Sequence, residues 1–458
     1  MIATTPPEDG PGAGWLAIRR FVRWGIRHGG PRLLLRAMTW SGSSIGRLLF
    51  DRGNQEEIFT LHQRMRRSGP LVGGSIAMGT SHHATADAVL RSPQYHAGPD
   101  SSPIARWAMA RGVNPAALGP LDAPSLLVVD PPDHTRYRRL VSKAFTARAV
   151  NGMAPEIARI TGRLLDDLAG VPSTDLVESF AKKVPVAVIA SMLAIPQNML
   201  DQFLRWSDQA APSLDLGITH QEFVVADQAL RETNQWLREH FHHVREHPGD
   251  YLLSELVRVV DDGDRLTEEE LLATAQLVLA AGFVTIVDML SSGIVLLLRH
   301  PGQLSALRAD PAGWPNAVEE ILRYESPVQV TARFATERTS LGTRPIPRGQ
   351  AVIAMLGGAN RDPAVFTDPE VFDVGRDNAK EHLAFSRGIH HCIGSGLARL
   401  EGEIALRGLF ERFPQLSLAS APVRRPGGVL RGYSCVPVLL GPAASPGANL
   451  TERAARNA

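Results

Sequence analysis

Residues 385–394 read Phe385-Ser386-Arg387-Gly388-Ile389-His390-His391-Cys392-Ile393-Gly394. Glycines stand four residues before and two residues after the cysteine, so the backbone there can bend tightly and approach a flat partner closely. The residues that follow predict a long helix from about 394 to 413. Unpaired N–H groups at a helix N-terminus favour negative charge and would stabilise a thiolate. Cys392 is therefore the first candidate for a functional residue.

Two other interpretations of Cys392 come from its residue type alone. An isolated cysteine is often a buried structural thiol. The run of His390, His391 and Cys392 could suggest zinc, but adjacent residues rarely converge on one metal, and no second ligand pair follows at zinc-finger spacing. The chain has two cysteines, which could form at most one disulfide, so nothing indicates an oxidising compartment.

Helical periodicity, interrupted by proline and glycine, dominates the 458 residues. The longest predicted helix is 267–300, where Thr267 and Glu270 form a capping box and Pro301 ends the helix. Its apolar residues lie on nearly every side, which places it in the centre of a large domain. Shorter helices are expected at 56–67, from 133, after Thr146 and at 315–324, and strands between 327 and 355. The fold class is mainly α with a small β-rich region.

Composition narrows the class of partner. The chain is 44% hydrophobic and 21% charged with a formal net charge of +1, so it can bury a large core and offers no reason to expect nucleic acid. It has no run of eighteen apolar residues, and its first residues lack the pattern of a secretory signal. We expect a cytoplasmic protein and a monomer.

The N-terminal 50 residues form a basic amphipathic extension. No acidic residue occurs between Asp9 and Asp51. Arginines alternate there with apolar residues: Arg19, Arg20, Arg23, Arg27, Arg32, Arg36 and Arg47 with Trp15, Phe21, Trp24, Leu33 to Leu35 and Trp40. We favour entry helices whose apolar sides pack on the body while the arginines are solvated. Contact of residues 15–50 with an anionic membrane surface is the alternative.

The stretch 385–394 resembles the heme-binding loop of the cytochrome P450 superfamily, whose pattern is Phe, Gly or Ser, x, Gly, x, His or Arg, x, Cys, x, Gly. Further similar blocks follow in order from about 130 to 432. The resemblance implies a cytochrome P450 fold, with 51–458 as one catalytic domain and heme b between the central and last long helices. Cys392 would be the thiolate ligand of iron, in a loop shaped by Phe385, Gly388 and Gly394. Such a thiolate favours O–O cleavage.

Two blocks of the resemblance concern heme placement. Glu320 and Arg323 match the family's ExxR, and residues three apart share a helix face and can pair bidentately. The family usually adds a cation immediately before a later phenylalanine, where this chain has Val371, so another residue or none would complete the clamp. The resemblance also implies four partners for the heme propionates, which are His134, Arg138, Arg333 and His390, because buried carboxylates need paired groups.

The run Ala281-Gly282-Phe283-Val284-Thr285 is similar to the family's oxygen-activating motif. Gly282 would leave room for O2, and Thr285 would be the hydroxyl beside it, although buried threonines commonly bond their own helix backbone. Val284 stands where the family has a carboxylic acid, which removes the usual proton donor. Either water and Thr285 suffice, or Asp288, one turn beyond, substitutes.

The resemblance implies a monooxygenase that uses O2 to hydroxylate or epoxidise a small hydrophobic, natural-product-like substrate. Because the chain has no flavin or nicotinamide fingerprint, a separate ferredoxin and ferredoxin reductase would supply electrons. Arg136, Arg139, Lys143 and Arg387 could form the docking face. Substrate contacts are expected from 95–128, 195–225, Pro327 to Val330 and Leu430 to Tyr433. A peroxide-driven or non-oxygenating heme-thiolate enzyme is the alternative, and a heme sensor is a third.

Overall fold

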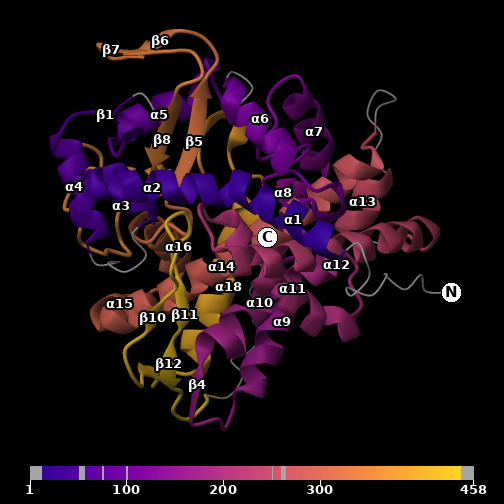
Figure 1. Cartoon of the computed structure of the whole chain (residues 1–458). Helices are drawn as coiled ribbons and strands as arrows, with labels where there is room; N and C mark the ends of the chain where they lie inside the picture. The colour runs from indigo at the N-terminus through magenta and orange to yellow at the C-terminus, as the bar shows by residue number, and fades with distance from the viewer. Residues whose placement is uncertain are drawn as a thin grey trace.

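The computed structural model describes residues 13–50, 57–74, 77–98, 102–249, 251–258 and 265–444 (Figure 1). Its longer helices are α1 (Ala13–Trp24), α2 (Gly30–Trp40), α4 (Ile58–Arg67), α5 (His83–Arg91), α6 (Pro103–Gly112), α7 (Asp133–Ser142), α9 (Ala154–Asp167), α10 (Lys183–Met192), α11 (Leu200–Ala210), α12 (His220–Glu246), α14 (Glu268–Arg299), α15 (Pro301–Ala309), α16 (Trp314–Tyr324) and α18 (Ser395–Arg412). Shorter ones are α3 (Ser44–Phe50), α8 (Ala147–Gly152), α13 (Leu252–Arg258) and α17 (Leu356–Ala359).

The strands of the described residues are short and lie in four small sheets. They are β1 (Val72–Gly73), β2 (Ala77–Thr80), β3 (Tyr95–His96), β4 (Ser173–Asp175), β5 (Val330–Ala335), β6 (Thr339–Leu341), β7 (Arg344–Ile346), β8 (Ala351–Met355), β9 (Ser417–Leu418), β10 (Val423–Arg424), β11 (Tyr433–Cys435) and β12 (Pro437–Leu439). The largest sheet has the order β1-β2-β8-β5-β3, with β2 parallel to β8 and Arg333 of β5 opposite Val352 of β8. The predicted mainly α class with a small β region is confirmed.

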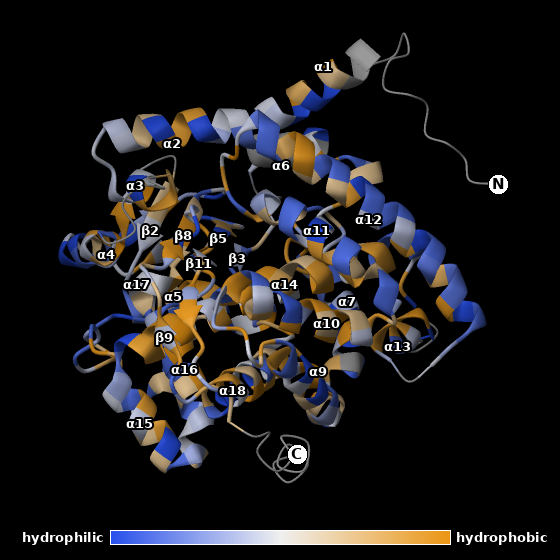
Figure 2. Ribbon diagram, turned by 90° about the horizontal axis from the view of Figure 1, so that it is seen from below, coloured by the Kyte–Doolittle hydropathy of each residue, from blue (hydrophilic) through white to orange (hydrophobic). Residues whose placement is uncertain are grey.

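Helix α14 runs through the middle of the molecule, with α10, α9 and α18 around it (Figure 2). Thr267 accepts a hydrogen bond from the backbone of Glu270, whose side chain accepts one from the backbone of Thr267, so the predicted capping box forms. Among the described helices α14 is long and apolar enough to cross a membrane, but 78% of its most apolar window is buried. It is the core helix of the fold, since a helix that is apolar all round needs protein on every side.

The N-terminal helices α1 to α3 pack on the body, but three arginines of this segment, Arg20, Arg23 and Arg27, pair with buried carboxylates and are not solvated as expected. Asp227 of α12, which is buried, lies 3.5 Å from Arg20 Nε and 3.4 Å from Arg23 Nη2. Arg27 Nη2 lies 2.6 Å from the buried carboxylate of Asp122. The error arose because these aspartates are far away in the sequence. The boundary at residue 50 stays a prediction, and apolar residues of α2 and α3 share a core with α4, β5 and β8.

Candidate functional site

The loop before α18 wraps tightly around Cys392. The backbone N–H of Cys392 donates to Phe385 O at 2.9 Å, and Ser386 N–H donates to Leu383 O at 2.8 Å. Gly388 has a φ of 70°, and a Cβ placed there would lie 2.3 Å from Leu90 O at the end of α5. The close contact excludes a Cβ at this position, and the left-handed region also favours glycine. The loop therefore holds the cysteine at a set position against α5.

The Cys392 side chain is accessible, although protein surrounds it closely. Desolvation raises the pKa of its thiol, against smaller lowering effects from the Gly394 backbone and from Arg138 and Arg399. The start of α18 stabilises the Cys392 thiolate as expected, but this effect is smaller than the desolvation that raises the pKa. A thiol in this environment becomes a thiolate when it coordinates a metal ion, which displaces the proton outright. Cys435, the other cysteine, lies on β11 and is half-buried.

The four predicted propionate partners come together from three parts of the chain. The rings of His134 on α7 and His390 have centroids 4.3 Å apart. His134 Nε2 is buried without a hydrogen-bond partner among the described residues. Burial, together with smaller effects from the nearby His390 and Arg138, lowers the pKa of His134 to about 4. Arg333 of β5 also acts on His134. Its own pKa is lowered to about 10 by burial.

Asp130 was missed as a member of this cluster. Its carboxylate accepts hydrogen bonds from Ala97 N–H at 3.0 Å and Gly98 N–H at 2.7 Å, and it lies 3.3 Å from His390 Nε2. Burial opposes its ionisation, but these hydrogen bonds outweigh the burial and lower its pKa. In the sequence it looked like part of a helix break before Pro131. Its position just ahead of the His134 helix was the available indication.

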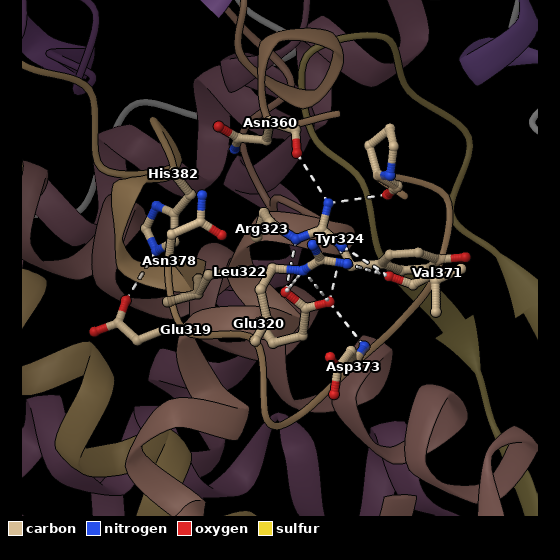
Figure 3. Close-up of polar contacts among 12 residues, drawn as sticks. Glu319, Glu320, Leu322, Arg323, Tyr324, Asn360, Val371, Asp373, Asn378 and His382 are labelled. Carbon is tan, nitrogen blue, oxygen red and sulfur yellow. Dashed lines mark hydrogen bonds and ion pairs between the residues drawn. The ribbon is translucent and has the colours of Figure 1, made fainter. Parts of the chain in front are cut away.

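The predicted Glu320–Arg323 pair forms and is completely buried (Figure 3). Arg323 Nε and Nη2 donate to the two oxygens of Glu320 at 2.6 and 2.8 Å. The remaining guanidinium hydrogens go to the carbonyls of Asn360, Pro369 and Val371, each at 3.0 Å. The clamp thus ties α16 to the segment 360–373, which precedes the cysteine loop.

The third member of the clamp is Arg376. Its Nε lies 3.3 Å from Glu320 Oε2, and its Nη1 donates to Thr367 O at 2.6 Å. Val371, at the family's usual position, exposes its side chain and contributes only its carbonyl. Next to the clamp, Glu319 pairs with His382 (Figure 3). Glu319 also accepts a hydrogen bond from Arg399 Nε at 2.6 Å. Burial opposes ionisation of Glu319, but those two partners lower its pKa to about 2.

Above the loop, α14 carries the predicted oxygen motif. Thr285 Oγ1 donates to Ala281 O at 2.6 Å, so the hydroxyl makes the backbone bond that we weighed as the alternative. A Cβ at Gly282 would lie 3.1 Å from Ile189 Cδ1 of α10, so glycine permits close contact between the two helices. That packing accounts for a glycine here, and room for O2 stays a prediction. Val284 is buried and carries no proton donor.

Comparison with known proteins decides the family. The cytochrome P450 family model matches residues 315–423. A protein named cytochrome P450 140, from Mycobacterium tuberculosis, is 42% identical over 431 residues, which is 93% of this chain and 98% of that protein. The chain belongs to the cytochrome P450 family. Another relative, 6-deoxyerythronolide B hydroxylase of Saccharopolyspora erythraea, is 44% identical over 315 residues, which is 68% of this chain and 76% of that protein.

Solved cytochrome P450 structures confirm the fold. The ligand-free structure of CYP164A2 from Mycobacterium smegmatis is 35% identical and has a TM-score of 0.78, covering 86% of this chain and 99% of that one. Epothilone D-bound cytochrome P450epoK is 30% identical with a TM-score of 0.78, covering 85% of this chain and 98% of that one. The protein is therefore an oxidoreductase of the monooxygenase class with the cytochrome P450 fold, and the family implies a heme iron cofactor.

The residues present fit a heme. An accessible cysteine sulfur lies in a loop built around it. A buried histidine nitrogen without a partner, on His134, lies beside the buried cation of Arg333. Both are suited to the carboxylates of a porphyrin, because a buried cation or donor is stable only when paired. Arg138 acts electrostatically on Cys392, so the propionate cluster and the sulfur border the same space.

The proposed acid Asp288 faces away from this motif within the described structure. It is buried, its Oδ2 is paired with Arg425, and its Oδ1 has no hydrogen-bond partner. A Cβ at Gly432 would overlap its carboxylate, so the side chain points to the segment between β10 and β11. Burial raises its pKa to about 7. No hydrogen bond joins it to Thr285 in the described residues, and a role as proton source stays a prediction.

Glu401 is a second buried acid that our reading of the sequence missed. It lies on α18, nine residues after Cys392, and its Oε2 has no hydrogen-bond partner in the described part of the chain. Burial raises its pKa to about 8, so it holds a proton at neutral pH. The adjacent Gly402 packs against Met289 of α14. Its spacing, four residues after Leu397 and three before Ile404 on one face of the helix, was the available indication.

Two further predictions concern the docking face for the electron donor and the segments that contact the substrate. Arg136 pairs with Glu270 at 3.0 Å and Arg387 lies 3.7 Å from Asp87, so part of the positive charge of the expected docking face is neutralised. Arg139 and Lys143 are exposed. The expected substrate segments Pro327 to Val330 and Leu430 to Tyr433 contact each other, because Arg431 N–H donates to Pro327 O at 2.8 Å. Val429, just before the second of them, donates its N–H to Asp215 Oδ1 of the expected segment 195–225 at 2.9 Å.

Proposed function

We propose that this cytochrome P450 is a heme b monooxygenase that hydroxylates or epoxidises a small hydrophobic, natural-product-like molecule. Electrons would come from a separate ferredoxin and ferredoxin reductase, in the cytoplasm, to a monomeric enzyme. The single observation that carries the proposal is an accessible Cys392 sulfur, held by the 385–394 loop next to a cluster of buried cationic groups. Bound heme would supply the activation of O2, with one oxygen atom entering the substrate and the other leaving as water after two electrons and two protons are added.

The chain's own groups would place the cofactor and manage protons. Cys392 would ligate iron, and Arg138, Arg333, His134 and His390 would pair with the propionates. The hydroxyl of Thr285 would hold a proton at Oγ1 next to the reaction space, and Asp288 or water would replenish it. The mixed apolar segments that meet at Val429 would exclude water from the substrate. The relatives named for 6-deoxyerythronolide B and the structure with epothilone D support a natural-product substrate.

The sulfur assignment is tested by the reduced carbon-monoxide difference spectrum of purified, heme-supplemented protein. We expect a thiolate-type band from the wild type and from Cys435→Ser, and its loss in Cys392→Ser. Cys435 is a matched control because it is the only other cysteine in the chain. A colourless wild type, or an unchanged band in Cys392→Ser, would contradict the proposal. A ligand screen that follows displacement of water from the iron would then identify the substrate class.

A peroxide-driven or non-oxygenating reaction is the second candidate, and Val284 favours it. Its apolar, buried side chain removes the usual acid, and a reaction that begins with peroxide needs fewer delivered protons. Turnover of an identified substrate with hydrogen peroxide, and none with ferredoxin, reductase and NAD(P)H, would select this candidate. Turnover only with the electron donors would reject it.

A further inference from the structure

The two helices at the N-terminus have their polar and apolar faces reversed relative to an ordinary surface helix. Arg20 and Arg23 of α1 face the body, where the buried carboxylate of Asp227 pairs with them, and Arg27 of the following π-helical turn pairs with the buried carboxylate of Asp122. Ile18, Phe21 and Val22, spaced to share a helix face, are each more than half exposed. Charged residues therefore point inward and apolar residues outward.

The same reversal continues along α2. Leu35 is buried against the core beneath the large sheet, while Leu33 is 67% exposed and Trp40 is 85% exposed. From α1 through the π-helical turn Gly25–Gly29 to α2, the chain is helical over residues 13–40. These elements follow one another along one rim of the molecule (Figure 2). At 1.5 Å per residue they form a rod of about 40 Å. Large exposed apolar surfaces of this kind mark interaction sites.

We propose that this rim, the outward face of α1 and α2, lies on an anionic lipid bilayer, with its apolar side chains inserted at the level of the headgroups. Arg19 and Arg36 are exposed beside the apolar residues, and no acidic residue occurs between Asp9 and Asp51. Tryptophan, represented by Trp40, prefers the membrane interface. Amphipathic helices of this size bury their apolar face about 5–10 Å deep and gain from basic residues near anionic headgroups.

Charge distinguishes the bilayer from a second copy of this chain. Two copies that met through this face would bring the arginines of both together without an acidic residue from either segment, which disfavours the contact. Phosphate headgroups supply the missing negative charge. Helix α6, which packs against the π-helical turn, adds an exposed Trp107 with Arg111 over its ring at 5.3 Å. The adjacent helix thus has the same combination of aromatic and basic residues.

Vesicle flotation of the holoenzyme tests the proposal. We expect binding to phosphatidylcholine vesicles that contain about 30% phosphatidylglycerol, and much weaker binding to phosphatidylcholine alone. Leu33→Ser/Trp40→Ser should weaken binding at least about 100-fold, because two large side chains no longer leave water. The control Val423→Ser/Leu439→Ser, in which residues of about half exposure on β10 and β12 are changed, should bind like the wild type.

The contribution of arginine charge to vesicle binding is tested by a second pair of double variants. Arg19→Gln/Arg36→Gln should weaken binding about 30-fold, which corresponds to roughly 1 kcal/mol for each basic residue near the surface. Arg148→Gln/Arg348→Gln, at exposed positions elsewhere, should have no effect. An unchanged carbon-monoxide spectrum in every variant would show that the fold is retained. Equal binding to both vesicle types, no flotation, or a wild-type dimer that Leu33→Ser/Trp40→Ser dissociates would each overturn the proposal.

Discussion

Replacement of Arg376 by methionine should destabilise the protein by about 3 kcal/mol. The side chain is 8% exposed and makes an ion pair with Glu320 at 3.3 Å. It also donates to Thr367 O at 2.6 Å and to Asp368 O at 3.3 Å. Methionine has a similar length, so the change removes the charge and the donors while it leaves only a small cavity.

The magnitude follows from which acceptors lose their donor. Glu320 and Val371 O keep Arg323, so the full loss of about 3–5 kcal/mol for an orphaned buried charge does not apply. The carbonyls of Thr367 and Asp368 lose a charged donor, and a hydrogen bond to a charged group contributes about 1.5–3 kcal/mol net. Partial hydration of these carbonyls offsets some of the loss of the two hydrogen bonds, which leaves a destabilisation of about 3 kcal/mol.

Urea unfolding of the holoenzyme, followed by heme absorbance and circular dichroism, measures this effect as a lower midpoint at unchanged slope. Arg407→Met is the matched control, because the largely buried Arg407 makes one ion pair with the exposed Glu411 one helix turn away, and such a pair contributes about 0.5 kcal/mol. If Arg376→Met and Arg407→Met lower stability by the same amount, Arg376 is not the third member of the clamp.

The remaining predictions concern a pKa, a glycine and an acid. The raised pKa of Glu401 means that the folded state keeps a proton that the unfolded state loses, so stability falls as pH rises from about 4.5 to about 8. Glu401→Gln should therefore gain stability relative to the wild type across that range, by at most about 1.4 kcal/mol per pH unit, and a pH-independent difference in thermal midpoint would refute this. Gly388→Ala should abolish stable heme incorporation, because its Cβ would collide with Leu90 O. The control Gly342→Ala, also at positive φ but in open space, should retain heme. Equal heme content in the two variants would contradict the argument from this contact. Asp288→Asn should lower the fraction of electrons that reach product, measured as product formed per NAD(P)H consumed, and unchanged coupling would eliminate Asp288 as the proton source.

Features that depend only on residues close together in the chain could be predicted from the sequence. The capping box at Thr267, the pair of Glu320 and Arg323, and the helix after Gly394 each depend on spacings of a few residues. Helical geometry converts such spacings directly into contacts, so no knowledge of the rest of the chain is needed. The resemblance to the cytochrome P450 family likewise rested on local blocks, above all on residues 385–394.

Contacts between distant segments were decided only by the tertiary structure. Arg376 entered the clamp from beyond the position where the family usually has its cation, and Asp130 joined His390 across 260 positions of sequence. Arg27, expected to be solvated, paired with Asp122. The sequence shows where a charged residue is but not which residue it pairs with. The energy of the interaction depends on burial and on which other charge the folded chain brings within about 4 Å. The local sequence determined the helices and the cysteine loop, and packing determined which charges those elements share.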